Sequence, residues 1–398
     1  MKYIILVPDG LADEPIDQLG GKTPLEAAQT PHMDFLASRG ISALVQTIPE
    51  GMAPGSDVGN LALMGYDPKI NFSGRAPLEA ASLGVKIRDD EVAFRCNLIT
   101  EKDGMIVDYS AGHIPSDEAQ VLIEYLQRAI DWPDVRFYPG KSYRHLMVLK
   151  TISIERMLKI KTVPPHDILN RPIKDYLPMG LQSELLLNLM KKSQEILSGH
   201  QVNQDKLDLK ENPANMIWLW GQGSKPNLPL FKDRYGLTGS VISAVDLVNG
   251  IGSLIGLEII HVPGANGYYD TNYQGKAQYA LASLKKHDFV YVHVEATDEA
   301  GHNGDYQAKL KCAEHFDNFI VGAVREYIQT HPDVRVLVAP DHPTPVAKRT
   351  HTSVPVPFIM YGHGIEPNGA KMYSEKEAGS KGIKFYSGSE MIKFFFKS

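Results

Sequence analysis

The sequence predicts an α/β fold: a parallel-rich sheet with helices on both faces, interrupted by a smaller, inserted α+β domain. Continuous apolar runs such as residues 3–7, 289–294 and 334–339 are typical of strands buried on both faces of a parallel sheet. Helical stretches separate the later runs, as expected where strands and helices alternate. Strands of mixed polarity fill the middle of the chain, which favours a second domain of different character.

The composition is that of an ordinary globular protein and argues against several classes of partner. With 398 residues, the chain is long enough for two domains. Its formal net charge is −6 and no basic block stands out, so a nucleic-acid partner is not expected. The N-terminal apolar run is too short for a secretory signal or a membrane span, so we expect a cytoplasmic protein without membrane association. Cys96 and Cys312 form no C-x-x-C pair and are expected to be buried and unreactive.

The first strand delivers an aspartate to the edge of the sheet where ligands collect. Residues 3–7 end at a Pro-Asp-Gly turn, which places Asp9 at the carboxyl end of the strand. The next segment, 30–40, is predicted to be a helix because it begins with Thr-Pro and ends with Gly40.

A serine follows the second predicted strand. Residues 41–47 are expected to form this strand, and the glycine-rich segment 51–59 after it contains Ser56. Residues 60–64 then start or continue a helix. A strand, a glycine turn with a serine and a helix together expose a hydroxyl at a helix N-terminus.

The middle of the chain is expected to form the inserted domain, which we place at residues 76–204, with the core formed by 1–75 and 205–398. Its predicted strands are 92–100, 105–109, 135–138 and 145–149, its predicted helices are 116–129 and 181–197, and residues 199–212 are predicted to be a connection.

Buried strands return in the last part of the chain and complete the core. Strands are predicted at 216–220, 258–262, 289–294, 334–339 and 358–361, with helices at 240–254, 275–284 and 307–328.

Five potential metal ligands follow the strands of this last part. Asp298 and His302 come after strand 289–294, Asp341 and His342 come after strand 334–339, and His351 lies ten residues further on. Each motif alone is common as a turn or a helix cap, but their joint placement predicts convergence with Asp9 and Ser56. Mixed carboxylate and imidazole ligands suit Mn²⁺ or Zn²⁺.

Such a site predicts phosphoryl transfer. Two divalent ions can stabilise both the attacking and the leaving oxygen of an in-line displacement. A serine hydroxyl is a weak nucleophile at its free pKa, and coordination to a metal lowers that pKa, so Ser56 is the expected nucleophile.

The order Asp…Ser…Asp-x-x-x-His…Asp-His…His resembles the cofactor-independent phosphoglycerate mutases of the alkaline phosphatase superfamily, and most closely their archaeal-type branch. The resemblance covers most of the chain and implies an alkaline-phosphatase-like core with an inserted cap domain. The supporting stretches are GGKTPLEAA at 20–28, PGSD at 54–57, LMGYDP at 63–68, GRAPLE at 74–79, FRCN at 94–97, ISAVD at 242–246 and YDTNYQGK at 269–276.

The resemblance also assigns roles by position. One metal would be held by Asp9, Ser56, Asp341 and His342, and the other by Asp298, His302 and His351. Lys276 would neutralise the phosphoryl group or the bridging oxygen, although a solvated lysine at a helix start is an equally plain interpretation. Mn²⁺ is the expected metal, with Zn²⁺ and Co²⁺ as alternatives. The residues expected to grip the carboxylate and hydroxyls of the substrate are Arg95, Asn97, His113, Arg144 and His145.

The activity implied by the resemblance is interconversion of 3-phosphoglycerate and 2-phosphoglycerate through phosphorylated Ser56, without 2,3-bisphosphoglycerate. The partner is then a small phosphorylated hydroxy acid. Residues 55–61 resemble a bacterial sub-branch proposed to act as homoserine kinase more than they resemble the archaeal mutases. Transfer to another alcohol such as homoserine, or phosphatase activity, therefore remains an alternative. A non-catalytic metal-binding protein is disfavoured because the whole set of ligands is present.

Overall fold

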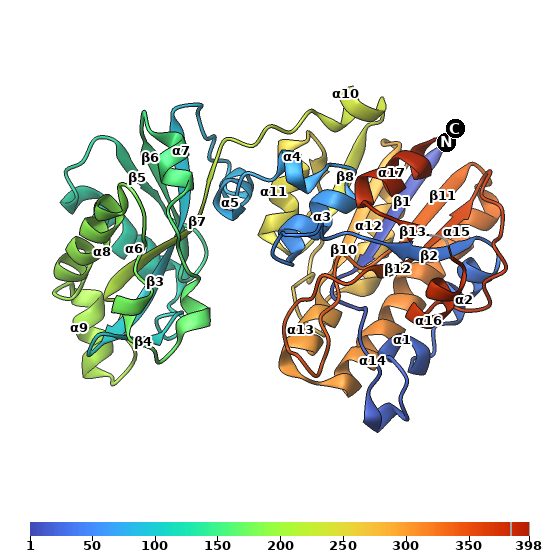
Figure 1. The fold of residues 1–398 in the computed structure, drawn as a ribbon, viewed down its shortest axis with the longest axis horizontal. Helices are drawn as coiled ribbons and strands as arrows, with labels where there is room; N and C mark the ends of the chain where they lie inside the picture. Colours follow the sequence, from blue (N-terminus) through green and yellow to red (C-terminus); the bar gives the residue numbers. More distant parts are fainter. Residues whose placement is uncertain (383, 398) are drawn as a thin grey trace. The chain divides into compact units, whose positions relative to one another are not determined.

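The computed structural model describes residues 1–382 and 384–397. The chain divides into two compact units, a larger one formed by Met1–Phe72 with Asn227–Ser398 and a smaller one formed by Ser73–Pro226 (Figure 1). The smaller unit is thus inserted into the larger one.

The larger unit is built on a mainly parallel sheet. Within the described residues this sheet has eight strands in the order β13-β2-β12-β11-β1-β10-β8-β9. Only β12 runs against its described neighbours, because it pairs antiparallel with both β11 and β2. The strands are β1 (Lys2–Pro8), β2 (Ile41–Val45), β8 (Gly239–Ile242), β9 (Glu258–Ile259), β10 (Phe289–Val294), β11 (Val334–Val338), β12 (Val356–Gly362) and β13 (Lys384–Phe385).

The central strand β1 is covered on both faces. Ile4 and Leu6 point into a buried cluster that contains side chains of α2 (Pro31–Ser38) and α12 (Tyr273–Ser283). The neighbouring Tyr3 lies against the rings of α17 (Gly388–Phe396), as alternation along a strand requires. The predicted parallel-rich sheet with helices on both faces is therefore confirmed.

The strand register brings three strand ends to one edge. Pro8 at the end of β1 pairs with Val294 at the end of β10, and Leu6 pairs with Val338 at the end of β11. Residues that follow these strands therefore start from one edge of the sheet. The other helices of this unit are α1 (Pro24–Ala27), α3 (Ser56–Leu63), α4 (Pro68–Asn71), α10 (Phe231–Tyr235), α11 (Asp246–Leu254), α13 (Ala296–Asn303), α14 (Tyr306–His315), α15 (Gly322–Thr330) and α16 (Glu375–Ser380), with the short helical turns η1 (Asp17–Leu19) and η4 (Phe316–Val321).

Two predicted helices differ from the structure in the larger unit. The predicted helix 240–254 was wrong at its start, because residues 239–242 form β8, which pairs with β10, and only Asp246–Leu254 is helical. The predicted helix 307–328 is one helical stretch that contains a π-helical segment, η4, between α14 and α15.

The smaller unit is an antiparallel sheet with helices packed on it. Its strand order is β4-β3-β6-β5, and β7 pairs with the edge of β3 opposite to β6. The elements are α5 (Arg75–Ser82), β3 (Glu91–Lys102), β4 (Met105–Asp108), α6 (Ser116–Ala129), β5 (Val135–Tyr138), β6 (Arg144–Lys150), α7 (Ile154–Leu158), η2 (Pro165–Ile168), η3 (Ile173–Asp175), α8 (Ser183–Leu197), α9 (Gln201–Asp208) and β7 (Met216–Ser224).

The structure differs from three expectations for the middle of the chain. The strand predicted at 216–220 does not belong to the core sheet. Met216–Ser224 pairs instead with β3, in the sheet of the smaller unit. The expected inserted range 76–204 is accordingly shorter than the observed unit, Ser73–Pro226. The expected connection 199–212 contains the helix α9.

Two further expectations concern cysteines and membranes. Cys96 and Cys312 are both buried, as predicted, and neither forms a disulfide. No helix among the described residues combines the length and the apolar character needed to cross a membrane.

Gly59 tests how closely α3 must approach the end of β11. A Cβ atom added at Gly59 would lie 2.5 Å from the carbonyl oxygen of Asp341, so the backbone of α3 or of Asp341 would have to shift. We expect Gly59→Ala to lower the free energy of unfolding by about 1–3 kcal/mol, measured by denaturant titration. Gly199→Ala is the control, because nothing lies within 4 Å of its added Cβ. Equal stability of the two variants would contradict the close approach.

Candidate metal centre

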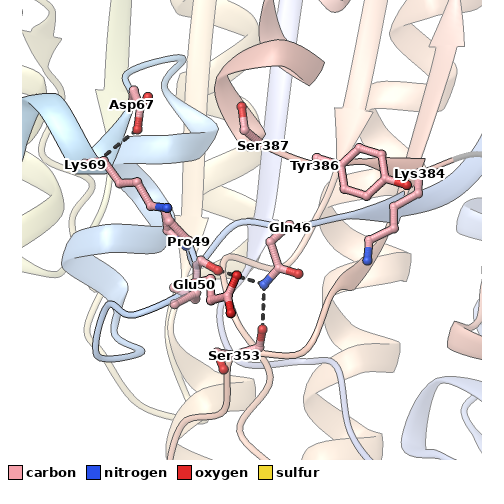
Figure 2. A pocket seen from close by; sticks show the side chains of 10 residues that line it. Gln46, Pro49, Glu50, Asp67, Lys69, Ser353, Lys384, Tyr386 and Ser387 are labelled. Atoms are coloured by element: carbon pink, nitrogen blue, oxygen red, sulfur yellow. Dashed lines mark hydrogen bonds between the residues drawn. The ribbon is translucent and has the colours of Figure 1, made fainter.

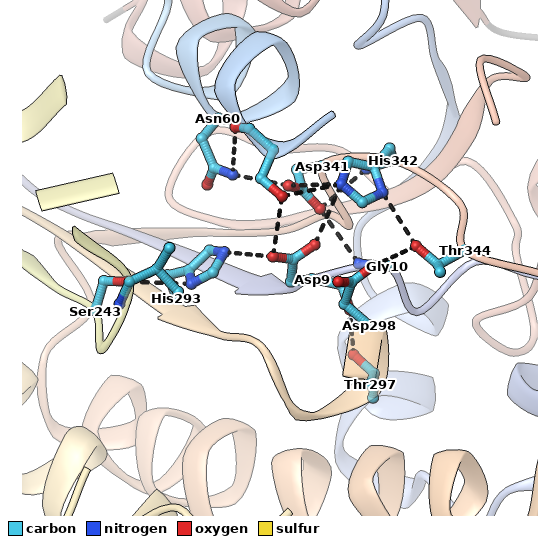
Figure 3. A network of polar contacts seen from close by, with 12 residues as sticks. Asp9, Gly10, Asn60, Ser243, His293, Thr297, Asp298, Asp341, His342 and Thr344 are labelled. Atoms are coloured by element: carbon cyan, nitrogen blue, oxygen red, sulfur yellow. Dashed lines mark hydrogen bonds and ion pairs between the residues drawn. The ribbon is translucent and has the colours of Figure 1, made fainter. Parts of the chain in front are cut away.

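All seven predicted metal ligands lie in the larger unit, around the edge where β1, β10 and β11 end. Figure 3 shows four of them: Asp9, Asp298, Asp341 and His342. Asp9 directly follows β1, and Ser56 is the first residue of α3. Asp298 and His302 lie on α13, which begins two residues after β10. The other three follow β11 in the segment that leads to β12: Asp341, His342 and His351.

The first predicted group of ligands converges on the imidazole of His342. Its Nε2 lies 3.1 Å from Ser56 Oγ and 3.5 Å from Asp9 Oδ1. The same nitrogen lies 3.5 Å from Asp341 Oδ2, and Ser56 Oγ is 3.5 Å from Asp9 Oδ2. The four side chains that sequence analysis assigned to one metal are therefore brought together.

The second predicted group converges on the carboxylate of Asp298. Its oxygens lie 3.2 Å from His302 Nε2 and 3.5 Å from His351 Nε2, and these two nitrogens are 2.9 Å apart. The rings of His351 and His342 have centroids 4.1 Å apart, so the two groups adjoin.

The electrostatics of the centre fit a bound cation. Asp9 and Asp341 are fully buried, and Asp298 is nearly so. Burial, followed by the charges of Asp341 and Asp298, raises the pKa of Asp9 well above its usual range. Among the described residues, Asp9 Oδ1 is a buried oxygen without a hydrogen-bond partner. An unpaired oxygen among buried carboxylates and imidazoles is a donor set that suits divalent ions.

One histidine, His302, supplies part of the positive charge that the centre needs. Burial raises the pKa of Asp298, but hydrogen bonds from His302 and His351 outweigh it and hold that pKa well below its usual range. The same hydrogen bond to Asp298 raises the pKa of His302 to about 9. The carboxylate therefore requires a positive partner, and metal and protons compete for these side chains.

Two side chains that were not predicted from the sequence hold the ligands in place through hydrogen bonds. His293 Nε2 lies 3.0 Å from Asp9 Oδ2, and its Nδ1 lies 3.2 Å from Ser243 Oγ. Asn60 donates from its amide to Asp341 Oδ2 at 2.7 Å and to the Ser56 carbonyl at 2.9 Å. Two signals were available: a histidine inside the apolar run 289–294, and an asparagine one helical turn after Ser56.

Lys276 is buried rather than solvated. Its Nζ is enclosed and donates to the carbonyl oxygen of His293 at 2.8 Å. Burial lowers the pKa of Lys276 to about 8, against an opposing effect of Glu295. Burial, together with the charges of Asp298 and Glu299, raises the pKa of Glu295 to about 8. The solvated interpretation of Lys276 is therefore wrong.

Three of the predicted substrate residues share one face of the sheet in the smaller unit. Asn97 on β3 pairs with Arg144 on β6, and Arg95 lies two residues along on the same face. The Arg95 guanidinium lies 4.1 Å from the ring centre of Trp220, and its Nε lies 2.8 Å from a carboxylate oxygen of Glu79.

The other two predicted substrate residues have different environments. The ring of His113 lies 6.4 Å from that of Tyr143, over which the Arg144 guanidinium also lies at 5.7 Å. His145 pairs with Cys96 and points to the opposite face from Arg144, since consecutive strand residues alternate. Its Nδ1 accepts a hydrogen bond from the Gly140 N–H, and burial lowers its pKa to about 3.

A separate hollow on the larger unit contains none of the predicted site residues. Its volume is about 530 Å³, and its charged side chains balance in sign, so it offers no net attraction to a phosphate (Figure 2). The charged residues that line it are Glu50, Asp67, Lys69 and Lys384.

Asp9→Asn tests the strain of burying like charges. We expect this variant to be more stable than the wild type when both are metal-free at neutral pH, because it removes a buried charge beside Asp341 and Asp298. It should also lose the rise in unfolding temperature that Mn²⁺ gives the wild type. Asp333→Asn, at an exposed side chain, is the control and should change stability by less than about 0.5 kcal/mol. Lower stability of metal-free Asp9→Asn would contradict the repulsion.

Comparisons with known proteins identify the family of this chain. A family model described as 2,3-bisphosphoglycerate-independent phosphoglycerate mutase matches residues 37–203. A protein of that name from Methanosarcina acetivorans is 48% identical over 394 residues, which cover 98% of each chain. A relative from Geobacter sulfurreducens, named as a probable enzyme of this kind, is also 48% identical, with 98% of each chain covered.

Solved structures show the same fold. A protein from Pyrococcus horikoshii is similar with a TM-score of 0.83 and 28% identity, covering 99% of this chain and 96% of that one. A cofactor-independent phosphoglycerate mutase from Thermoplasma acidophilum is similar with a TM-score of 0.67 and 27% identity, covering 99% of both chains. On the identity and coverage of these relatives, the chain belongs to the family of 2,3-bisphosphoglycerate-independent phosphoglycerate mutases.

Proposed function

We propose that the chain interconverts 3-phosphoglycerate and 2-phosphoglycerate without 2,3-bisphosphoglycerate, through a phosphoserine at Ser56. The observation that carries this proposal is the position of Ser56 Oγ, 3.1 Å from His342 Nε2 and 3.5 Å from Asp9 Oδ2. A hydroxyl at this position contacts a buried carboxylate and a buried imidazole, although Ser56 itself is only half-buried. Membership of the mutase family supports the choice of substrate. The cytoplasmic location expected from the sequence is part of the proposal.

The position of Ser56 at the start of a helix suits a nucleophile that accepts a phosphoryl group. It begins α3, an eight-residue helix whose first N–H groups and dipole favour the negative charge of a phosphate. Asn60 fixes the start of this helix, because its amide donates both to the Ser56 carbonyl and to Asp341. The hydroxyl of Tyr291 in turn donates to Asn60 Oδ1 at 2.7 Å, so the asparagine cannot rotate freely.

The centre would hold two divalent ions, with Mn²⁺ preferred and Zn²⁺ or Co²⁺ as alternatives. When bound, the ions would lower the pKa of the serine hydroxyl and neutralise charge on the transferring phosphoryl group. One ion would be held by Asp9, Ser56, Asp341 and His342, and the other by Asp298, His302 and His351.

The transfer occurs in two steps that mirror each other. Ser56 Oγ forms a bond to phosphorus while the bond from phosphorus to the 3-oxygen of glycerate breaks, and the proton lost by the serine ends on the freed 3-hydroxyl. Glycerate then shifts, and its 2-oxygen forms a bond to phosphorus while the bond from phosphorus to Ser56 Oγ breaks. The proton lost by the 2-hydroxyl ends on Ser56. Lys276, buried behind His293, adds a positive charge near the carboxylates of this edge.

The smaller unit would act as the cap that grips glycerate and excludes water from the phosphoserine. Arg95, Asn97 and Arg144 share one face of its sheet, which suits recognition of a carboxylate and hydroxyls. His113 is joined to this group through Tyr143. His145 faces the other way, so we leave it out of the proposed substrate contacts.

The direct test follows 2-phosphoglycerate in a coupled assay of Mn²⁺-loaded protein with 3-phosphoglycerate and no bisphosphoglycerate. We expect isomerisation that a chelator abolishes and that Ser56→Ala lowers by at least about a thousandfold, because the covalent step is lost. Ser38→Ala, at an exposed serine, should keep wild-type activity.

The outcome also separates alternative acceptors. Substantial turnover by Ser56→Ala would contradict the covalent route. A metal-loaded wild type without isomerisation would contradict the mutase assignment and favour transfer to another alcohol, with homoserine tested next. Release of glycerate and phosphate would favour a phosphatase.

Arg95 tests the substrate contacts of the smaller unit. We expect Arg95→Met to lower kcat/KM about 10- to 100-fold, the cost of a lost charge-assisted hydrogen bond, while Mn²⁺ binding is unchanged. Arg95→Lys should fall in between, because it keeps the charge but not the planar fork. Arg128→Met, at an exposed arginine of α6, is the control. Full kcat/KM in folded Arg95→Met would contradict this role.

A further inference from the structure

One hydroxyl group joins the two predicted groups of metal ligands. Thr344 is fully buried, and its Oγ1 hydrogen-bonds to Asp298 Oδ1 and lies 3.2 Å from Nδ1 of His342 (Figure 3). Asp298 belongs to one group and His342 to the other. Thr344 itself is in neither predicted ligand set.

The hydrogen bonds at Thr344 can run in one direction only if both are made. A carboxylate oxygen accepts, so the single hydroxyl hydrogen of Thr344 is donated to Asp298. The hydroxyl oxygen then accepts from an N–H at His342 Nδ1. This leaves the lone pair of His342 on Nε2, the nitrogen that lies 3.1 Å from Ser56 Oγ. A histidine that binds a metal commonly has its other nitrogen fixed in this way.

We propose that Thr344 is a positioning residue that couples the two halves of the metal centre. Its hydroxyl sets the ring orientation and the free nitrogen of His342 in one half, and fixes the carboxylate of Asp298 in the other. This inference rests on the proposed two-metal centre, but not on the identity of the substrate.

A buried ion pair fastens the backbone at Thr344. Lys309 Nζ donates to the Thr344 carbonyl at 2.8 Å and to Asp13 Oδ2 at 2.7 Å. The Asp13 carboxylate also accepts from the N–H of Val346, at 3.1 Å to Oδ2. Both charged side chains are enclosed, and such pairs contribute little net stability. Their value here is that they hold the chain on the C-terminal side of the threonine.

Two glycines leave the space that Thr344 occupies. A Cβ atom at Gly10 would lie 2.6 Å from Thr344 Oγ1 and 2.5 Å from Asp298 Oδ1. A Cβ atom at Gly301 would lie 2.3 Å from the Thr344 carbonyl oxygen. Gly10 also has φ +62°, so a side chain there would be strained as well as crowded. The surroundings are therefore shaped to the threonine on both its side-chain and its backbone side.

The test titrates metal-free full-length protein with Mn²⁺ and measures both stepwise binding constants by calorimetry. Thr344→Val keeps the shape of the side chain and removes both hydrogen bonds, so we expect both constants to fall about 10- to 100-fold. Thr344→Ser keeps the hydroxyl and should stay within about threefold of the wild type. Thr47→Val is the control, since Thr47 is a fully buried threonine of the same unit whose hydroxyl has no partner among the described residues.

Each outcome decides the inference. Unchanged binding by Thr344→Val, loss confined to one of the two constants, or failure of Thr344→Ser to restore binding would overturn the coupling role. If Thr344→Val does not fold, Thr344→Ala replaces it. A cooperative thermal unfolding transition of the metal-free variant is the check that it is folded. A wild type that binds no Mn²⁺ would overturn the metal centre together with this inference. Normal coupling in a protein without mutase activity would leave the inference standing and overturn the proposed substrate.

Discussion

The burial of like-charged carboxylates at the end of parallel strands is the constraint on which the rest of the structure depends. Asp9 and Asp341 are fully buried, and their mutual repulsion adds to the cost of burial. Neutral donors offset part of this cost, since Asn60 and the Gly10 N–H both donate to Asp341. The remainder calls for positive charge, which divalent ions would supply. The site is therefore costly to build and suited to binding cations.

The fold supplies what this constraint requires. The parallel register of β1, β10 and β11 places three strand ends side by side, so that short segments suffice to bring the ligands together. Helices on both faces exclude water from the strands, which strengthens the electrostatic interactions at their ends. Glycines allow the helices to approach the segment after β11 closely. Gly59 lets α3 contact the backbone of Asp341, and Gly301 lets α13 contact Thr344. Ser56 thus reaches the carboxylates from a separate element.

Much of the core could be predicted because its signals are local. Apolar runs a few residues before Asp9, Asp298 and Asp341 indicated both the strands and the edge of the sheet where these ligands meet. Residues 239–242 were misassigned because a short apolar run does not distinguish a strand from a helix. The pairing of Met216–Ser224 with β3 is a long-range contact that no local pattern contains. The opposite directions of Arg144 and His145 follow from the period of a strand and could have been predicted. The roles of Thr344 and Lys309 depend on contacts that form only in the folded chain, so no local sequence pattern predicts them.

The most direct test of the account is anomalous diffraction at the manganese edge from crystals of the full chain grown with Mn²⁺. The account predicts two adjacent anomalous peaks at the edge of the sheet in the larger unit, each within bonding distance of one predicted ligand group. A single peak, or peaks away from these side chains, would contradict it. The two groups are Asp9, Ser56, Asp341 and His342 for one ion, and Asp298, His302 and His351 for the other.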